Sequence, residues 1–301
     1  MRAVYISFVL NLIILILKVI AFTQSKSSAV DAEFLHALGN AVGSGMLVLG
    51  LILMNRRPSF RYPFGFGRGI YVAGLISASI VGGFLFSISL FTGLNQLKSL
   101  ESVYVTQESL LAVAAATFMD FSMFVWAFHE FRKGMNDPST RNTLVENLTD
   151  CVGDVIAVAA LTTVNPLLDA VGALIIAAIL LISSISLGFK YAEVLIGRSA
   201  PKNVLGRAVK VVLSDPRVVD VNDVKSLVIG PNQYLLLIQV EVPENLSVEE
   251  INAVREELVS RITSAEQSVK HVVIEFYKPT EPPKTFKEVL KDIITLSPSK
   301  E

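Results

Sequence analysis

Two sets of polar side chains lie inside strongly apolar stretches of the sequence and repeat at helical spacing. His36 and Asn40 are four residues apart, and Glu146, Asp150 and Asp154 follow one another at the same spacing. Residues four apart lie on one face of an α-helix, so each set forms a polar stripe. If the two stripes face each other, an imidazole nitrogen, an amide oxygen and two or three carboxylates converge. Such a donor set suits a borderline divalent cation in four-coordinate geometry.

The carboxylates of the second stripe require a positive partner. A charge at the centre of a membrane span costs about 2.5–3.5 kcal/mol on insertion scales. Three carboxylates without a basic partner would also repel one another, so we expect a bound cation or bound protons there. The alternative interpretation is a polar contact between helices that holds no ligand.

Other polar residues of the apolar stretches admit structural as well as functional interpretations. Asp120 is expected to assist a proton path, to take part in additional metal binding, or to make a structural hydrogen bond. Lys18 is expected to donate hydrogen bonds inside the protein or to extend its ammonium group toward the membrane surface. Asp31 and Glu33 either attract cations to the outer mouth of their span or interact with its helix dipole. Asp169 is expected to be a capping residue.

The composition places these stretches in a membrane. Hydrophobic residues make up 52% of the 301 residues and charged residues only 18%, whereas about 25% of residues are charged in soluble domains. A helix needs about 20 mostly apolar residues to cross the hydrocarbon core of a bilayer. Six segments meet this requirement and are predicted to span the membrane: 4–23, 29–54, 69–94, 104–131, 142–163 and 167–190.

The distribution of basic residues predicts the orientation of these spans. The loops after the second and fourth spans carry seven Lys and Arg residues, against two in the opposite loops. Because basic loops remain on the cytoplasmic side, both termini are expected in the cytoplasm. The chain is expected to be a multi-pass protein of the plasma membrane.

Charge density divides the chain into two parts. Of the first 197 residues 24 are charged, against 29 of the last 104. We predict a transmembrane transport domain over 1–197, a cytosolic domain over 198–280 and a C-terminal tail over 281–301. The cytosolic part is predicted to be a small α+β domain, of the metallochaperone kind, with the order αββαβ. Its elements are expected at Asn203–Ser214, Val218–Ile229, Tyr234–Val242, Ser247–Thr263 and Val269–Phe276, with a capping box formed by Ser247 and Glu250.

Several classes of function are excluded by composition and by the lack of motifs. The formal net charge is −1, so no basic surplus indicates nucleic-acid binding, and the single Cys151 cannot form a CxxC motif. The sequence contains no Walker-type phosphate loop and no GxSxG or HExxH motif. We therefore expect a protein that is not an enzyme and has no cofactor.

Five segments, in their order along the chain, resemble the cation diffusion facilitator family of metal–proton antiporters. SSAVDAEFLHALGNAVGSGMLVLGL is similar to the family's second span, and RRPSFRYPFGFGRGIYVAGLISA to the next loop and third span of one branch. LVENLTDCVGDV is similar to the fifth span, LIGRSAP to the exit from the sixth, and VIGPNQYLLLIQVEVPENLSVEEI to the cytosolic domain. The resemblance implies an α-helical domain of six transmembrane helices and a homodimer formed through the cytosolic domain.

The resemblance also implies a transport site. The family's metal ligands fall on His36, Asn40, Glu146 and Asp150. Asn40 stands where Asp is usual, and Glu146 where His or Asp is usual. Asp154, one turn further, is an additional candidate for metal binding or proton relay, and a pairing of Asp150 with Asp154 remains open.

The expected function is secondary active transport: efflux of a divalent cation, with zinc first, in exchange for protons. Mn²⁺, Fe²⁺, Co²⁺ and Cd²⁺ also fit one nitrogen and several oxygen donors, and the metal would be a substrate rather than a cofactor. The expected partners are the metal ion, protons, the lipid bilayer and a second copy of the chain. The alternatives are transport of manganese or iron(II), or of a non-metal solute with the stripes as a proton relay.

Overall fold

The computed structural model describes residues 2–132 and 138–279. The chain divides into two compact units. The first consists of residues 1–52 and 72–191, and the second of residues 53–71 and 192–301. The tail expected at 281–301 lies outside the described residues.

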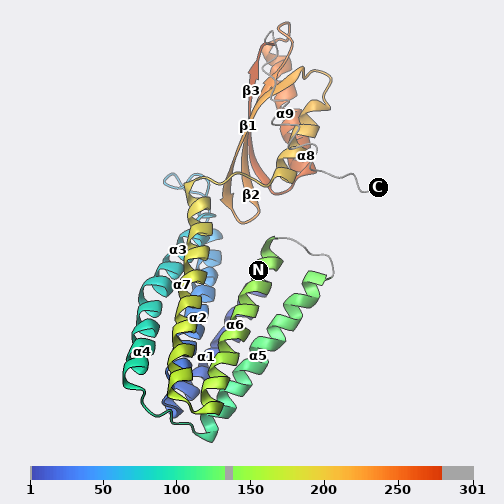
Figure 1. Ribbon diagram of the computed structural model, residues 1–301. Coiled ribbons are helices and arrows are strands. Elements are labelled where there is room, and N and C mark those ends of the chain that lie inside the picture. The colour runs from blue at the N-terminus through green and yellow to red at the C-terminus, as the bar shows by residue number, and fades with distance from the viewer. Residues whose placement is uncertain (1, 133–137, 280–301) are drawn as a thin grey trace. The chain divides into compact units, whose positions relative to one another are not determined.

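The first unit is a bundle of long helices (Figure 1). A π-helical turn at Val81–Leu85 joins α3 and α4 into one rod. The helices are α1 (Arg2–Gln24), α2 (Ser28–Met54), α3 (Gly69–Ile80), α4 (Phe86–Ser99), α5 (Gln107–Arg132), α6 (Pro138–Thr163) and α7 (Pro166–Ile196). The described residues therefore contain helices at the positions of all six predicted spans.

Five of these rods are long and apolar enough to cross a membrane within the described part of the chain: α1, α2, α3 with α4, α5 and α7. The exception, α6, begins with the polar run PSTRNT and carries the acidic stripe, which lowers its hydropathy. A helix this polar is stable in a bilayer only where neighbouring helices satisfy its charged groups. The predicted helical membrane domain is confirmed, and its least apolar span carries the candidate site.

The start of α2 is capped by a residue from another helix. Asp169, in the first turn of α7, accepts hydrogen bonds from the backbone N–H groups of Ser28 (2.8 Å) and Ala29 (3.1 Å). Asn165 caps α7 itself by accepting from the N–H of Leu167 at 2.9 Å. Asp169 is thus a capping residue, but of α2 rather than of the helix at whose start it lies, and it fixes the end of the helix that carries His36.

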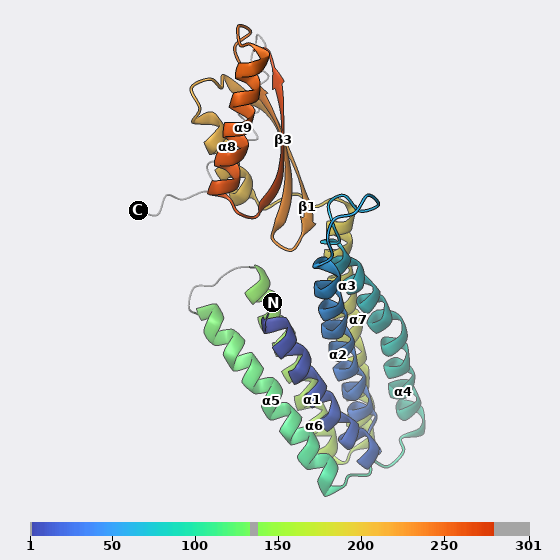
Figure 2. The same ribbon diagram turned by 180° about the vertical axis from the view of Figure 1, so that it is seen from behind.

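The second unit contains a three-stranded sheet in the order β1-β2-β3. The β1 and β2 strands are antiparallel, whereas β2 and β3 are parallel. Both helices lie on the same face of the sheet (Figure 2). The elements are α8 (Lys202–Leu213), β1 (Asp220–Gly230), β2 (Gln233–Glu241), α9 (Val248–Ala265) and β3 (Val269–Tyr277). The predicted αββαβ order is confirmed, as is the capping box, because Ser247 and Glu250 exchange hydrogen bonds of 2.7 and 3.2 Å.

The loop between α2 and α3 packs on this sheet and belongs to the second unit. Arg68 donates from Nε to the carbonyl oxygen of Val228 at 2.9 Å. The ring of Phe64 lies edge-on to the imidazole of His271 in β3, with 5.3 Å between centroids. A Cβ atom at Gly67 would lie 2.4 Å from a carbonyl oxygen of β1, so only glycine permits this approach. This loop was expected to belong to the transmembrane domain, and its docking on the sheet was not predicted.

We predict that Asp215→Asn weakens the second unit at neutral pH. Asp215 is buried and accepts from the backbone N–H and the guanidinium of Arg217. These hydrogen bonds hold the pKa of its carboxyl below the ordinary value. A lowered pKa stabilises the fold above the unfolded-state value of about 4, and this stabilisation is lost as pH falls through the folded-state pKa. The expected loss at pH 7 is about 1–3 kcal/mol.

Hydrogen exchange of the full-length protein in detergent, corrected for intrinsic rates, measures this effect. The variant should exchange faster than wild type in α8 and β1 at pH 7, and the difference should shrink as the pH falls below about 4. The control is Asp223→Asn, because Asp223 pairs with a lysine at the surface. Equal exchange in the Asp215 and Asp223 variants would contradict the prediction.

Candidate metal and proton site

A buried polar cluster lies inside the helical bundle, where α1, α2, α5 and α6 meet. Six of its side chains are buried and one, Asn40, is half-buried. In the described part of the chain the cluster consists of Lys18, Glu33, His36, Asn40, Asp120, Asp150 and Asp154. Burial in an apolar bundle strengthens every electrostatic interaction within this group.

One half of the cluster joins the two predicted stripes. His36 Nε2 lies 3.4 Å from Asp150 Oδ1, and Asn40 Nδ2 donates to the same oxygen at 2.9 Å. The stripes of α2 and α6 therefore face each other. Asn40 presents its amide nitrogen here, so its oxygen would have to turn inward to bind a metal.

The other half is organised around Lys18. Its Nζ atom lies 2.7 Å from Glu33 Oε1, 2.8 Å from Asp154 Oδ1 and 3.4 Å from Asp120 Oδ2. Lys18 thus makes interior contacts, which was one of the two interpretations given above. The premise that the carboxylates lack a basic partner was wrong, because α1 supplies one.

Glu33 connects the two halves. Its Oε1 atom contacts Lys18 Nζ at 2.7 Å and lies 3.5 Å from His36 Nδ1. The interpretation of Glu33 as a cation attractor at the outer mouth does not hold, since its side chain is buried and pairs with Lys18. Gly153 makes room for it, because a Cβ atom there would lie 2.3 Å from Glu33 Oε2.

Negative groups outnumber positive groups in the described cluster. Four carboxyl groups face one ammonium and one imidazole, so a surplus remains even when His36 is protonated. Buried oxygens of three carboxyl groups have no hydrogen-bond partner among the described residues: Glu33 Oε2, Asp120 Oδ2 and both oxygens of Asp154. Of these, Asp120 Oδ2 and Asp154 Oδ1 still form ion pairs with Lys18. Buried charge of this kind is unfavourable unless protons or a further cation compensate for it. The cluster is therefore suited to exchanging cations.

Glu146 takes no part in the hydrogen bonds and ion pairs given for the cluster. It lies one turn before Asp150 on α6, and its side chain is exposed. The next residue, Asn147, is buried and donates from Nδ2 to the carbonyl of Met123 at 3.2 Å. No three His, Cys, Asp or Glu side chains of the described residues are arranged as a complete set of metal ligands. Metal binding at this place requires side chains to turn.

The helical part of the chain matches the model of a known protein family. The family model described as the cation efflux transmembrane domain matches residues 4–196. The chain belongs to the cation efflux family. Members of this family are transporters, so the prediction of a transporter rather than an enzyme is confirmed for this cation efflux protein. The resemblance to cation diffusion facilitators is confirmed by the same match.

Curated relatives of this cation efflux protein carry names that refer to metals. It is 27% identical over 260 residues to the Xenopus laevis protein named proton-coupled zinc antiporter SLC30A9, mitochondrial, covering 80% of this chain and 46% of the relative. It is 26% identical to Arabidopsis thaliana metal tolerance protein C4, in a match that covers 77% of this chain and 55% of the relative. It is 23% identical to metal tolerance protein 10 of the same plant, in a match that covers 91% of this chain and 65% of the relative. The chain thus spans about half the length of the first of these relatives.

The expected plasma-membrane location is contradicted by these relatives. The SLC30A9 proteins of frog, mouse and human are all named as mitochondrial. The distribution of basic loop residues predicts which side of a membrane a loop occupies but carries no information on which membrane it is. The multi-pass membrane character of this cation efflux protein is unaffected.

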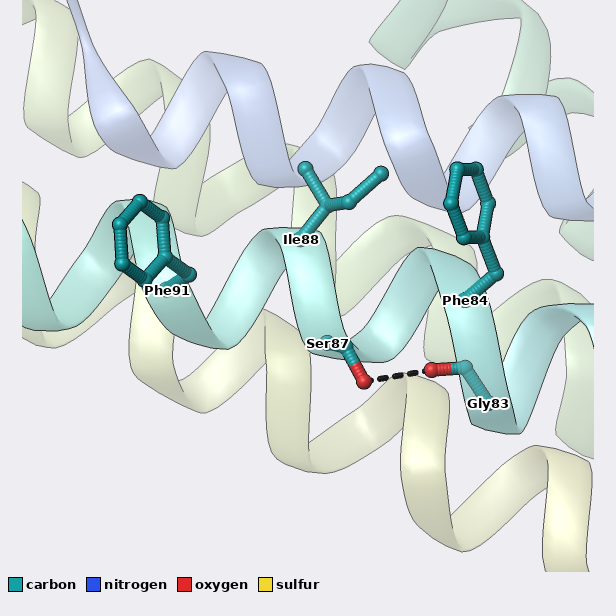
Figure 3. A pocket seen from close by; sticks show the side chains of 5 residues that line it. All are labelled: Gly83, Phe84, Ser87, Ile88 and Phe91. Carbon is teal, nitrogen blue, oxygen red and sulfur yellow. Dashed lines mark hydrogen bonds between the residues drawn. The ribbon is translucent and has the colours of Figure 1, made fainter.

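A separate groove lies on the outside of the α3–α4 rod (Figure 3). It is lined by Gly83, Phe84, Ser87, Ile88 and Phe91. The hydroxyl of Ser87 donates to the carbonyl of Gly83, so the groove offers mainly apolar surface. Both aromatic side chains are exposed, as expected for residues of a cation efflux protein that face lipid.

Lys18 and Glu33 are the two cluster residues that sequence reasoning left out of the candidate site. A signal existed for each: Lys18 interrupts an apolar helix, and Glu33 lies three residues before His36 on the same helical face. Asn11 contributes at the edge, donating to Ser44 Oγ at 3.2 Å and to the carbonyl of Asn40 at 3.4 Å.

Proposed function

We propose that this cation efflux protein transports a divalent metal cation across a membrane in exchange for protons, with zinc as the first candidate. The observation that carries the proposal is the meeting of His36 and Asn40 with Asp150 inside an apolar bundle. One imidazole nitrogen with carboxylate and amide oxygens is a donor set for zinc and for the neighbouring divalent metals. The names of the relatives support zinc and protons as substrates.

The proposed metal ligands are His36, Asn40, Asp150 and Glu146. The first three are already close together, and Glu146 completes the set by turning inward from its exposed position one turn away. An inward turn of Glu146 together with a flip of the Asn40 amide replaces the hydrogen bonds of the closed cluster with bonds to metal. We propose that Asp154 and Asp120 serve proton transfer, since both face Lys18 rather than His36.

The coupling follows from the chemistry of the ligands. Imidazole and carboxylate groups bind metal only when they are deprotonated, so an entering metal ion displaces protons. Protons that return from the opposite side release the metal there. Movement of the helices then exposes the site to each side in turn, as in other secondary transporters. We place this activity in an intracellular membrane, following the names of the mitochondrial relatives.

We also propose that the chain works as a homodimer joined through the second unit. The face of the sheet opposite α8 and α9 exposes Val273 and Tyr277 on β3. Exposed apolar side chains on a sheet face that neither α8 nor α9 covers are typical of surfaces that associate.

The test is transport in liposomes that contain a pH-sensitive dye and the purified protein. A gradient of Zn²⁺, Mn²⁺, Fe²⁺, Co²⁺ or Cd²⁺ is applied to wild type and to Asn40→Asp. We expect metal-driven proton flux for wild type, largest with Zn²⁺, and a changed order of metals for Asn40→Asp because an amide becomes a charged ligand. Proton flux that is the same with and without a metal gradient would overturn the proposal, and it would favour transport of a non-metal solute.

A further inference from the structure

Lys18 occupies a place that a metal ion could otherwise take. Its side chain is 5% exposed, and its ammonium contacts carboxylates from three other helices: Glu33 of α2, Asp120 of α5 and Asp154 of α6. The contacts are 2.7, 3.4 and 2.8 Å long, which are distances for an ammonium ion rather than for a metal. The three carboxylates thus surround one cation that is covalently part of the chain.

The surroundings of Lys18 differ in chemistry from those of Asp150. The Asp150 half combines the imidazole of His36 with oxygen donors, whereas the Lys18 half offers carboxylate oxygens. Oxygen-only donor sets bind hard cations such as Mg²⁺, Ca²⁺ and Mn²⁺. Two of these buried oxygens, Glu33 Oε2 and Asp154 Oδ2, lack a hydrogen-bond partner among the described residues. Without the ammonium, this half would present a second cation site of harder character.

We propose that Lys18 is a tethered cation that fills the carboxylate-rich half of the cluster and excludes a metal ion from it. The transported ion is thereby confined to the half that contains His36, where a nitrogen donor favours zinc over harder ions. Lys18 is therefore a specificity-determining residue. That the confined ion is the transported one rests on the proposed function, whereas the exclusion of a cation from the Lys18 half does not.

The experiment counts bound Mn²⁺ in the purified, detergent-solubilised full-length protein by electron paramagnetic resonance. Lys18→Gln and Lys18→Met both remove the charge and keep an unbranched side chain. We expect each to bind one more Mn²⁺ per chain than wild type, and the additional ion to be lost when Asp154→Asn is combined with either. Lys18→Arg keeps a cation in place and should bind as wild type does. Lys26→Gln, at an exposed lysine of the following loop, is the matched control.

Two results would overturn the proposal. One is an unchanged Mn²⁺ count in a charge-removing variant whose circular dichroism and elution profile match wild type. The other is the failure of both charge-removing variants to fold while Lys18→Arg folds, because Lys18 would then be a structural tie only. Metal-driven transport by wild type is measured separately. A lack of transport would contradict the proposed function, whereas an unchanged Mn²⁺ count would contradict this inference.

Discussion

Asp150→Asn is expected to lower metal-driven transport on the order of 100-fold or more, since even the partners that only orient metal ligands contribute 10- to 100-fold. Asp150 is the carboxylate that contacts both His36 and Asn40 in the described cluster. Asparagine has the same shape, and its amide oxygen can still accept the hydrogen bond from Asn40. The substitution therefore removes a charge and leaves the packing of the helices intact, so it tests the proposed metal-binding role separately from any structural role.

Transport of Zn²⁺ and the accompanying proton flux are measured in the same liposomes. The control is Cys151→Ser, which alters the neighbouring residue on α6, a half-buried thiol that lies off the stripe. This control should transport at the wild-type rate. Transport by Asp150→Asn within a few-fold of wild type would show that the metal binds elsewhere in the bundle.

The second large effect is expected from Gly153→Ala. A Cβ atom at this position would lie 2.3 Å from Glu33 Oε2 and 3.0 Å from its carboxyl carbon. Glu33 cannot retreat freely, because Lys18 holds its other oxygen at 2.7 Å. Either α6 moves away from α2 or the Glu33 carboxylate leaves its ammonium partner. We expect a loss of about 1–3 kcal/mol in stability, in the range of overpacked cores, together with reduced transport.

A second glycine provides the control for this prediction. A Cβ atom at Gly83 meets nothing within 4 Å, so Gly83→Ala adds the same methyl group in open space. Thermal unfolding in detergent and Zn²⁺ transport are compared for the two variants. Equal melting temperatures and equal transport rates would show that the close approach of α6 to Glu33 affects neither stability nor transport.

The membrane helices and the small sheet could be predicted from the sequence because each depends on local patterns. Hydropathy marks the spans, and the capping box at Ser247 and Glu250 marks the start of α9. The polar stripe on each of α2 and α6 was also accessible, since residues spaced by four lie on one face of a helix. These features require no knowledge of how helices are rotated against one another.

The composition of the cluster was not accessible, because it depends on the rotation and register of packed helices. Four residues advance a helix by about 40° beyond a full turn, so Glu146 and Asp154 point about 80° apart. Asp154 therefore faces Lys18, while Glu146 is exposed. The pairing of Lys18 with Glu33 needs the same information about α1 and α2. Likewise, the local motif around Phe64 does not indicate a partner in β3, some two hundred residues later.

The docking of the loop between α2 and α3 changes how the two units are linked. The chain passes from one unit to the other at three places, after residues 52, 71 and 191. The second unit is thus not joined to the first by a single linker. Cutting the chain after α7 would separate the sheet from residues 53–71, which belong to the same unit. One of the three connections continues directly from α2, the helix that carries His36 and Asn40. The helix that carries the proposed ligands is therefore also the helix whose following residues pack on the sheet.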